Sequence, residues 1–474
     1  MSTTALVRIH SVRSLGPSFF HKRTLAALVR LVATALAFAP GLAQAQTTTH
    51  IQTDGSLGAA VLLDPQITDS SLYVIGEDLG AVINQNLYHS FEQFDLATGD
   101  TGRFTGSSAI SNVVSRITGA NPSHLEGKLE SKIPGANFYF LNPNGVLFGQ
   151  NAQVSVPAAF HVSSAENGSF ANGMQLVLDS DTGLPSNLEM APIERFGFIG
   201  GEIKLSGTTL LFGDFGSFDP GSSDTIGTIG GDLSFRGGDI ELSQGAKLLG
   251  LNKTVTIQAS GDLLLHGVST PPDGDGFGSG IDVANFGDQG PNPKPESIQL
   301  SGRNVELGES SYLIAETIGA GCDSSTGASC TGQIVVEATS RITLNPGAQD
   351  PEPSEFSSLR FPGLNIDSAP GSSPATILTY RDTSSGDTGS VRLEASEIFL
   401  VDESRVQALE RDPDNISTPR STGNVEKIGT ILPLPIKDPV EVLPIPKKNP
   451  SPPGNGTEPN FDTDPGPTLG EEPP

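Results

Sequence analysis

Residues that could carry out chemistry are few and widely separated in this sequence. After residue 45 the histidines are His50, His89, His124, His161 and His266, and none pairs at a spacing typical of metal ligands. No GxSxG, HExxH or GxxxxGK motif occurs. We interpret Glu92 and Asp95, the nearest approach to a hydrolase carboxylate pair, as solvated or turn-capping groups. The sequence therefore predicts no catalytic residue, no metal site and no cofactor.

One stretch raises the question of calcium binding. Asp273 to Ala284 reads DGDGFGSGIDVA and partly matches the calcium-binding GGxGxDxUx repeat through Gly278, Gly280 and Asp282. Phe277 replaces the first Gly of that repeat, and Ala284 is small where a large apolar residue belongs. Because β-rolls need several tandem copies, a loop without calcium is the preferred interpretation.

A different kind of motif has a conformational role. Asn142, Pro143, Asn144 and Gly145 form an NPNG sequence between the apolar runs FYFL and VLFG. Pro143 fixes φ near −65°, Asn144 and Gly145 readily adopt positive φ, and the Asn142 side chain can bond its own backbone. The tetrapeptide therefore predicts a stiff turn between two strands.

An internal repeat indicates the elements that must hold these turns. Ile203, Leu205, Gly207, Leu210 and Phe212 have the spacing apolar-x-apolar-x-small-x-x-apolar-x-apolar, which recurs from Leu233, Ile298 and Val391. Copies from Val255 and Ile334 carry one extra residue after the small position. Each copy reads as two strands around a corner, and a single copy cannot bury its apolar face alone.

Copies of this kind must stack, so we expect an all-β fold, a parallel β-helix with one coil per copy. A β-sandwich is the rival interpretation, but it gives no reason for identical corners to recur. The Gly, Pro and Asp-rich insertions, residues 269–297 and 346–374, are expected to be projecting loops.

The two ends of the chain differ in composition from the rest. The first 45 residues hold five basic residues and no acidic one. Within them, the apolar run LVATALAFA and then the small-residue site Ala43-Gln44-Ala45 follow the last basic residue. This is typical of a secretory signal peptide cleaved after Ala45. At the other end, 13 of the residues from Ile431 to Pro474 are Pro, which predicts a disordered tail.

Charge and cysteine content narrow the class of partner and the compartment. The formal net charge of −27 repels DNA, RNA and anionic membranes, so we expect no nucleic-acid partner and no membrane insertion. The two cysteines, Cys322 and Cys330, are close enough in sequence to close a small loop in an oxidising compartment. Two free thiols are the alternative.

Three longer segments carry a family resemblance. NLYHSFEQFDL, SNVVSRITGANPSHLEGKLE and NFYFLNPNGVLFGQNAQVSV occur in this order between Asn86 and Val156. Together they closely resemble the secretion domain of filamentous-haemagglutinin-like exoproteins of two-partner secretion systems. The NPNG motif of that family matches Asn142, Pro143, Asn144 and Gly145. The earlier NPNL motif appears as NQNL at Asn84, Gln85, Asn86 and Leu87, so its turn should be less rigid.

The resemblance implies a right-handed parallel β-helix with an N-terminal cap. It also implies export through the periplasm and then through an outer-membrane β-barrel partner with POTRA domains. We expect a signal peptide at 1–45, a two-partner-secretion domain at 46–200, repeats at 201–411 and a Pro-rich tail at 412–474. The function expected from the resemblance is adhesion, with a host-cell or surface ligand, for a secreted or cell-surface protein. A β-helix polysaccharide-active enzyme and a structural surface protein are the alternatives.

Overall fold

The computed structural model describes residues 48–165, 167–170, 175–177, 193–196, 201–213, 227–266, 278–286, 297–308, 311–318, 332–344, 357–361, 364–368, 375–382, 389–400, 405–412, 415–422 and 424–433. All of these fall within one of two units of the chain, Met1–Leu434, and the second unit is Pro435–Pro474. The expected signal peptide and the pair Cys322 and Cys330 lie outside the described residues.

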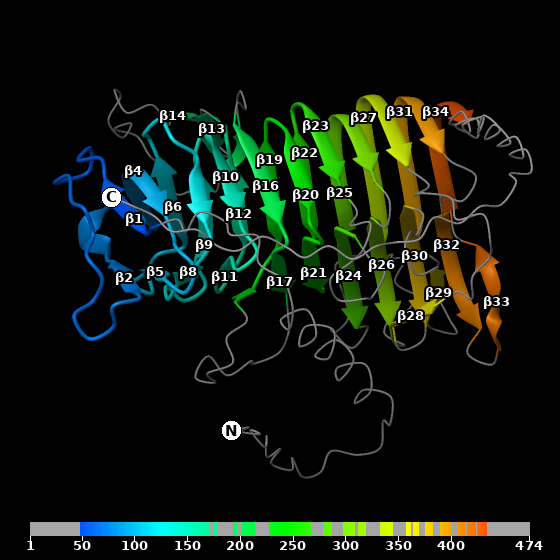
Figure 1. The fold of residues 1–474 in the computed structure, drawn as a ribbon, viewed down its shortest axis with the longest axis horizontal. Coiled ribbons are helices and arrows are strands. Elements are labelled where there is room, and N and C mark those ends of the chain that lie inside the picture. Colours follow the sequence, from blue (N-terminus) through cyan, green and yellow to red (C-terminus); the bar gives the residue numbers. More distant parts are fainter. Residues whose placement is uncertain are drawn as a thin grey trace, which may run out of the picture. The chain divides into compact units, whose positions relative to one another are not determined.

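Half of the described strands belong to one large, mainly parallel sheet (Figure 1). Its strands are β1 (His50–Thr53), β3 (Ala81–Ile83), β4 (Asn86–Asp95), β6 (Asn112–Ile117), β7 (Ser123–Leu125), β9 (Asn137–Leu141), β10 (Gly145–Phe148), β12 (Phe160–Ser163), β16 (Glu202–Ser206), β19 (Leu233–Gly237), β20 (Ile240–Ser243), β22 (Val255–Ala259), β23 (Asp262–Leu265), β25 (Ser297–Leu307), β27 (Gln333–Leu344), β31 (Ser390–Leu400) and β34 (Asn424–Pro433).

Two further sheets supply the remaining limb of each coil. A parallel four-stranded sheet holds β2 (Leu72–Ile75), β5 (Thr101–Phe104), β8 (Lys128–Ser131) and β11 (Gln153–Ser155). An eight-stranded sheet holds β17 (Thr209–Gly213), β18 (Thr228–Ile229), β21 (Lys247–Leu251), β24 (Gly280–Phe286), β26 (Tyr312–Ile318), β30 (Thr376–Asp382), β32 (Arg405–Asp412) and β33 (Asn415–Thr422). Its strands pair in parallel except for β33, which pairs antiparallel with β32.

From Leu233 onward, coil-to-coil pairing places equivalent residues of the repeat directly above one another, as the spacing predicts. The copy from Ile203 is offset, because Ile203 pairs with Ile240 in the second strand of the next copy. One column, here called the His89 column, runs through the large sheet in register. Its members are His89, Ser115, Phe140, Val162, Phe235, Ile257, Leu300, Val336, Leu393 and Lys427. The apolar members are at most 2% exposed and belong to the hydrophobic core. The parallel β-helix is therefore confirmed, and its core is a stack of apolar columns.

Aromatic rings fill the core of the first coils, whereas aliphatic side chains fill the later ones. Phe104 lies edge-on to Phe138 with ring centroids 4.7 Å apart, and Phe94 lies edge-on to Phe140 at 5.3 Å. Each buried ring contributes roughly 2–3 kcal/mol through removal of its apolar surface from water. The core of the N-terminal coils is thus mainly aromatic.

The structure differs from the sequence expectation in two ways. Each repeat was expected to supply two strands, but strands such as β21 and β26 form a third limb. Strand β24 belongs to the same third limb and lies inside residues 269–297, which were expected to be a loop. That expectation was wrong over Gly280–Phe286. The strand was missed because Gly and Asp surround its short apolar alternation.

Extra antiparallel elements lie outside the coils. Strands β13 (Asn167–Phe170), β14 (Gln175–Val177) and β15 (Ile193–Phe196) form a small sheet, and β28 (Ser357–Phe361) pairs with β29 (Leu364–Ser368). The described helical content is one 3₁₀ turn, η1 (Glu77–Leu79). No helix of the described residues is long and apolar enough to cross a membrane.

The two ends of the stack are built differently. At the N-terminal end, β1 and β3 both pair antiparallel with β4 and so cover the edge of the first coil. At the C-terminal end, β34 pairs in parallel with β31. Strands β33 and β34 occupy residues 415–433, which the sequence analysis assigned to the tail.

Candidate functional site

The NPNG corner joins β9 to β10, as the sequence predicts. The amide of Gly145 donates to the carbonyl of Asn142 at 3.0 Å, which closes the turn. The Asn142 Oδ1 accepts from the Asn144 backbone amide at 2.9 Å. Asn142 and Gly145 are buried, Pro143 is half-buried and Asn144 is exposed.

Asn142 also bonds to the neighbouring coils, because its side chain lies inside the stack of corners. Its Nδ2 donates to the carbonyl of Asn121 and to the Ser123 Oγ, both at 3.0 Å. Its backbone amide donates to the carbonyl of Ser163 in the following coil at 2.9 Å. The Asn144 Nδ2 donates to the carbonyl of Gly119 at 2.7 Å. One tetrapeptide therefore ties three successive coils together.

Gly145 is required at this corner by its conformation and by its neighbours. Its φ is +114°, and a Cβ there would lie 2.4 Å from the carbonyl oxygen of Glu202 in the next coil. The close approach comes from the parallel pairing of β10 with β16, in which Gly145 is opposite Glu202.

Substituting Gly145→Ala is expected to destabilise the protein by at least about 2 kcal/mol, because positive-φ strain and a backbone clash act together. Urea unfolding followed by circular dichroism measures this change. Gly99→Ala is the matched control, because Gly99 has a φ of +88° and open space around its Cβ position. Equal costs for the two variants would show that the clash with Glu202 is unimportant.

The NQNL sequence forms the tight turn of an antiparallel hairpin. Strand β3 pairs with β4 so that Ile83 is opposite Asn86, and Asn84 and Gln85 make the connection. Asn84 has a φ of +57°, a left-handed conformation that Asn tolerates better than most residues. Asn84 and Gln85 are exposed, whereas Asn86 and Leu87 are buried.

Asn86 begins a ladder of side-chain amides that the sequence analysis did not identify. The Asn112 Nδ2 donates to the Asn86 Oδ1 at 2.8 Å, and the Asn137 Nδ2 donates to the Asn112 Oδ1 at 3.0 Å. The backbone amide of Ala159 donates to the Asn137 Oδ1 at 3.2 Å. The sequence does contain a pattern that could have predicted this ladder. In NLYH, NVVS and NFYF, each Asn immediately precedes a residue of the same apolar column.

The two motifs are not brought together into one site. Asn86 begins β4, while Asn142 follows the end of β9, so they lie at opposite ends of the strands that β4, β6 and β9 place side by side. The motifs are thus two separate clamps on the first coils.

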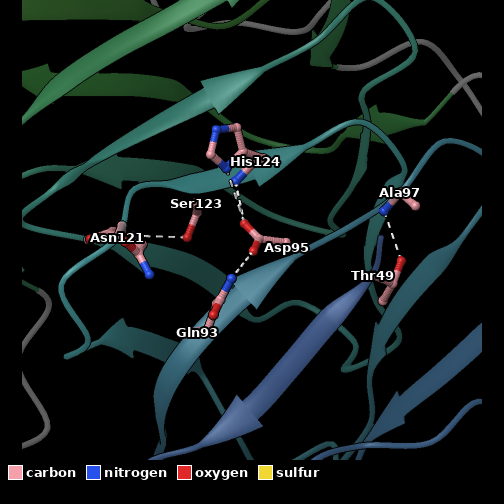
Figure 2. A network of polar contacts seen from close by, with 8 residues as sticks. Thr49, Gln93, Asp95, Ala97, Asn121, Ser123 and His124 are labelled. Atoms are coloured by element: carbon pink, nitrogen blue, oxygen red, sulfur yellow. Dashed lines mark hydrogen bonds and ion pairs between the residues drawn. The ribbon is translucent and has the colours of Figure 1, made fainter. Parts of the chain in front are cut away.

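A serine, a histidine and an aspartate lie near Asn142, but they do not form a catalytic triad. Figure 2 shows the Asp95 carboxylate between the Gln93 amide and the His124 ring. The His124 Nδ1 lies 3.5 Å from the Asp95 Oδ1, and this contact raises the pKa of His124. Ser123 and His124 are consecutive in β7, so their side chains point to opposite faces. Ser123 instead accepts from Asn142.

A second polar cluster fixes the N-terminal segment onto the first coils. The fully buried Arg116 donates through Nε to the Ser90 Oγ at 2.7 Å and through Nη2 to the Ser56 Oγ at 3.0 Å. The Asp54 carboxylate accepts from Ser90 and Thr118. Burial raises the pKa of Asp54, but these hydrogen bonds outweigh burial and leave it lowered.

The partial calcium repeat is part of an ordinary strand where it is described. Gly280 and Asp282 lie in β24, and Asp282 is buried, which raises its pKa to about 7. Residues 267–277 lie outside the described part. Among the described residues, no group of three or more His, Cys, Asp and Glu side chains could hold a metal ion.

The stacked parallel coils, with two antiparallel strands at the N-terminal end, place the chain among the β-solenoid proteins. The family model of the TPS secretion domain matches residues 67–285, a range that contains both NQNL and NPNG. The chain therefore carries a TPS secretion domain, which supports a two-partner secretion exoprotein of the filamentous haemagglutinin type and implies a secreted or cell-surface location. No curated protein matches the chain.

Proposed function

We propose that this exoprotein crosses the periplasm unfolded and leaves through an outer-membrane barrel with POTRA domains, guided by the segment around NPNG. The burial of Asn142, which is 0% exposed and bonded to three coils, supports this order of events. A partner cannot contact that side chain once the coils have stacked. A partner can therefore recognise the whole motif only in the unfolded chain. In the folded chain the motif links neighbouring coils.

The segments on either side of the motif suit this double use. FYFL and VLFG become β9 and β10, which pair in parallel with the coils before and after them. In the unfolded chain the same backbone groups are free to add as a strand to the sheet edge of a POTRA domain. Release outside the cell lets them pair with neighbouring coils instead, and this folding favours outward movement without nucleotide.

Replacing Asn142 to Gly145 by alanine is expected to lower secretion through the partner about tenfold or more, because recognition and clamping are both lost. Immunoblots of medium and periplasm from cells that express chain and transporter measure this change. Unchanged secretion would mean that the motif is structural only.

Ile240→Ala is the matched control, because it removes a buried core side chain in a later coil and leaves the motif intact. We expect it to destabilise the purified protein by about 2–5 kcal/mol and still be exported. If it blocks export as strongly as the alanine motif variant, loss of folding rather than loss of recognition explains the block.

Adhesion to a host-cell or other surface ligand is the activity we propose for the exported chain. It rests on the family and on the solenoid, not on a binding site of the described residues. Binding of the purified protein to cells, compared with heat-unfolded protein, tests it. Cleavage of a polysaccharide would favour the enzyme alternative. Absence of both binding and cleavage would favour a structural surface protein.

A further inference from the structure

The terminal strand β34 is an additional copy of the repeat with two core positions broken. The register of β31 with β34 places Val425, Lys427, Ile431 and Pro433 opposite the core residues Val391, Leu393, Ile398 and Leu400. Gly429 lies over Ala395, where a Cβ would meet the Ala395 carbonyl oxygen at 1.9 Å. The apolar-x-apolar-x-small pattern therefore continues, except that Lys427 and Pro433 replace apolar residues.

Lys427 is the last member of the His89 column. Seven apolar residues precede it in the column, from Phe140 to Leu393, and Ser115 and His89 lie beyond them at the opposite end. A coil stacked on β34 would therefore enclose the Lys427 side chain as the preceding coils enclose Leu393. Burying an unpaired ammonium group is strongly unfavourable, and an inward-pointing charge is a known way to block an open sheet edge.

The same end of the stack is otherwise suited to pairing. Ile431 occupies a core position but is 52% exposed, and Ile428 is 38% exposed. The opposite end differs, because antiparallel β1 and β3 already cover β4. An end-to-end contact between two copies would thus join β34 to β34 about a two-fold axis, which gives a closed dimer and not a fibre.

We propose that Lys427 keeps the β34 end of this solenoid from pairing with the same end of a second copy. Pro433 assists, because it removes one N–H donor from the strand. The exposed core layer formed by Val425 and Ile431 is consequently tolerated in a monomer. The proposal concerns self-association alone and does not depend on the proposed export or adhesion.

Sedimentation velocity of the full chain across the micromolar range tests the proposal, with wild type compared with Lys427→Ile. We expect wild type to remain monomeric and the variant to form a dimer that dissociates on dilution. Lys427→Met, which preserves the length of the side chain, is the second variant if Lys427→Ile folds poorly. Both are expected to keep the strand circular dichroism of wild type.

Thr430→Ile is the matched control, because Thr430 is exposed on β34 and lies opposite Glu397 and not opposite a core residue. It adds apolar surface at an outward position and is expected to stay monomeric. Adding Ile431→Glu to Lys427→Ile is expected to restore the monomer. The proposal would be overturned if both Lys427→Ile and Lys427→Met stay monomeric, or if Thr430→Ile associates as strongly as Lys427→Ile. A wild-type dimer that Ile431→Glu dissociates would also overturn it.

Discussion

Lowering the pH from 7 to 4.5 is expected to destabilise the N-terminal coils by roughly 3 kcal/mol through His89 alone. His89 is fully buried, and burial lowers its pKa to about 4, although the carbonyl of Gly76 and the charge of Asp78 act in the opposite direction. Its ring lies between Phe91 and Phe104, with centroids 6.0 and 5.3 Å away, so no water can solvate an added charge.

The direction follows from the two states of the protein. Above pH 6.5 His89 is neutral in both the folded and the unfolded chain, so the full stability is present. Below pH 6.5 the unfolded chain binds a proton that the folded chain refuses, and stability falls until the folded pKa of about 4 is reached. Each unit within this window costs about 1.4 kcal/mol per histidine.

Two other histidines modify this result in opposite directions. His161 is stacked on Tyr139, and its pKa is lowered to about 4 by burial and by Arg236, so it adds to the loss. Because its folded pKa is the same as that of His89, its contribution to the loss is of similar size. His124 has a raised pKa through Asp95, so its contribution is present below pH 6.5 and is lost only at higher pH.

Urea unfolding at a series of pH values measures the effect, with His89→Phe as the decisive variant. Phe keeps the ring between Phe91 and Phe104, loses the hydrogen bond to Gly76 and has no proton to bind. Its stability should therefore fall less than that of wild type between pH 6.5 and 4.5, and the remaining loss comes mainly from His161. Identical slopes for the two proteins would mean that His89 is not the group responsible. Glu130 interferes little, because its contribution is lost between its ordinary pKa of 4.5 and its folded pKa of about 2, at the acidic limit of this range and below it.

The repeat in the sequence was sufficient to predict the stacking of the later coils, because each core position is marked by an apolar residue at fixed spacing. Leu233, Val255 and Ile298 share one core column, as the spacing predicts. The first copy is offset by one strand, because Ile203 pairs with Ile240. The third limb was not recognisable, since strands such as β24 are short and flanked by Gly and Asp. The coil at β34 was hidden by Lys427 and Pro433, which break the pattern that identified the others.

The candidate site shows a different limit. The turn at NPNG is local, so Pro143 and Gly145 were enough to predict it. The bonds that give the corner its importance are not local, because Asn142 reaches Asn121, Ser123 and Ser163 in other coils. Their pairing depends on coil length, which the first coils do not reveal through a regular apolar repeat.

Replacing Asn142 by alanine is expected to cost about 3 kcal/mol of stability, the largest loss at any single corner side chain described here. The substitution leaves the Asn121 carbonyl and the Ser123 Oγ without the donor that each receives at 3.0 Å, and it removes the acceptor for the Asn144 amide. Each buried polar group left without a partner costs about 1–3 kcal/mol. Urea unfolding at pH 7 measures the change.

Two matched variants separate burial from simple loss of a hydrogen bond. Asn144→Ala removes the bond to the Gly119 carbonyl at an exposed position, where water replaces it, and should cost about 1 kcal/mol or less. Asn142→Asp keeps the size of the side chain but presents oxygen lone pairs to Asn121 and Ser123, so it should destabilise at least as much as alanine. If Asn142→Asp were neutral at pH 7, the clamp between coils would come from packing and not from the amide donor. The corner would then have no need of asparagine at position 142, and only the unfolded chain could account for its presence there.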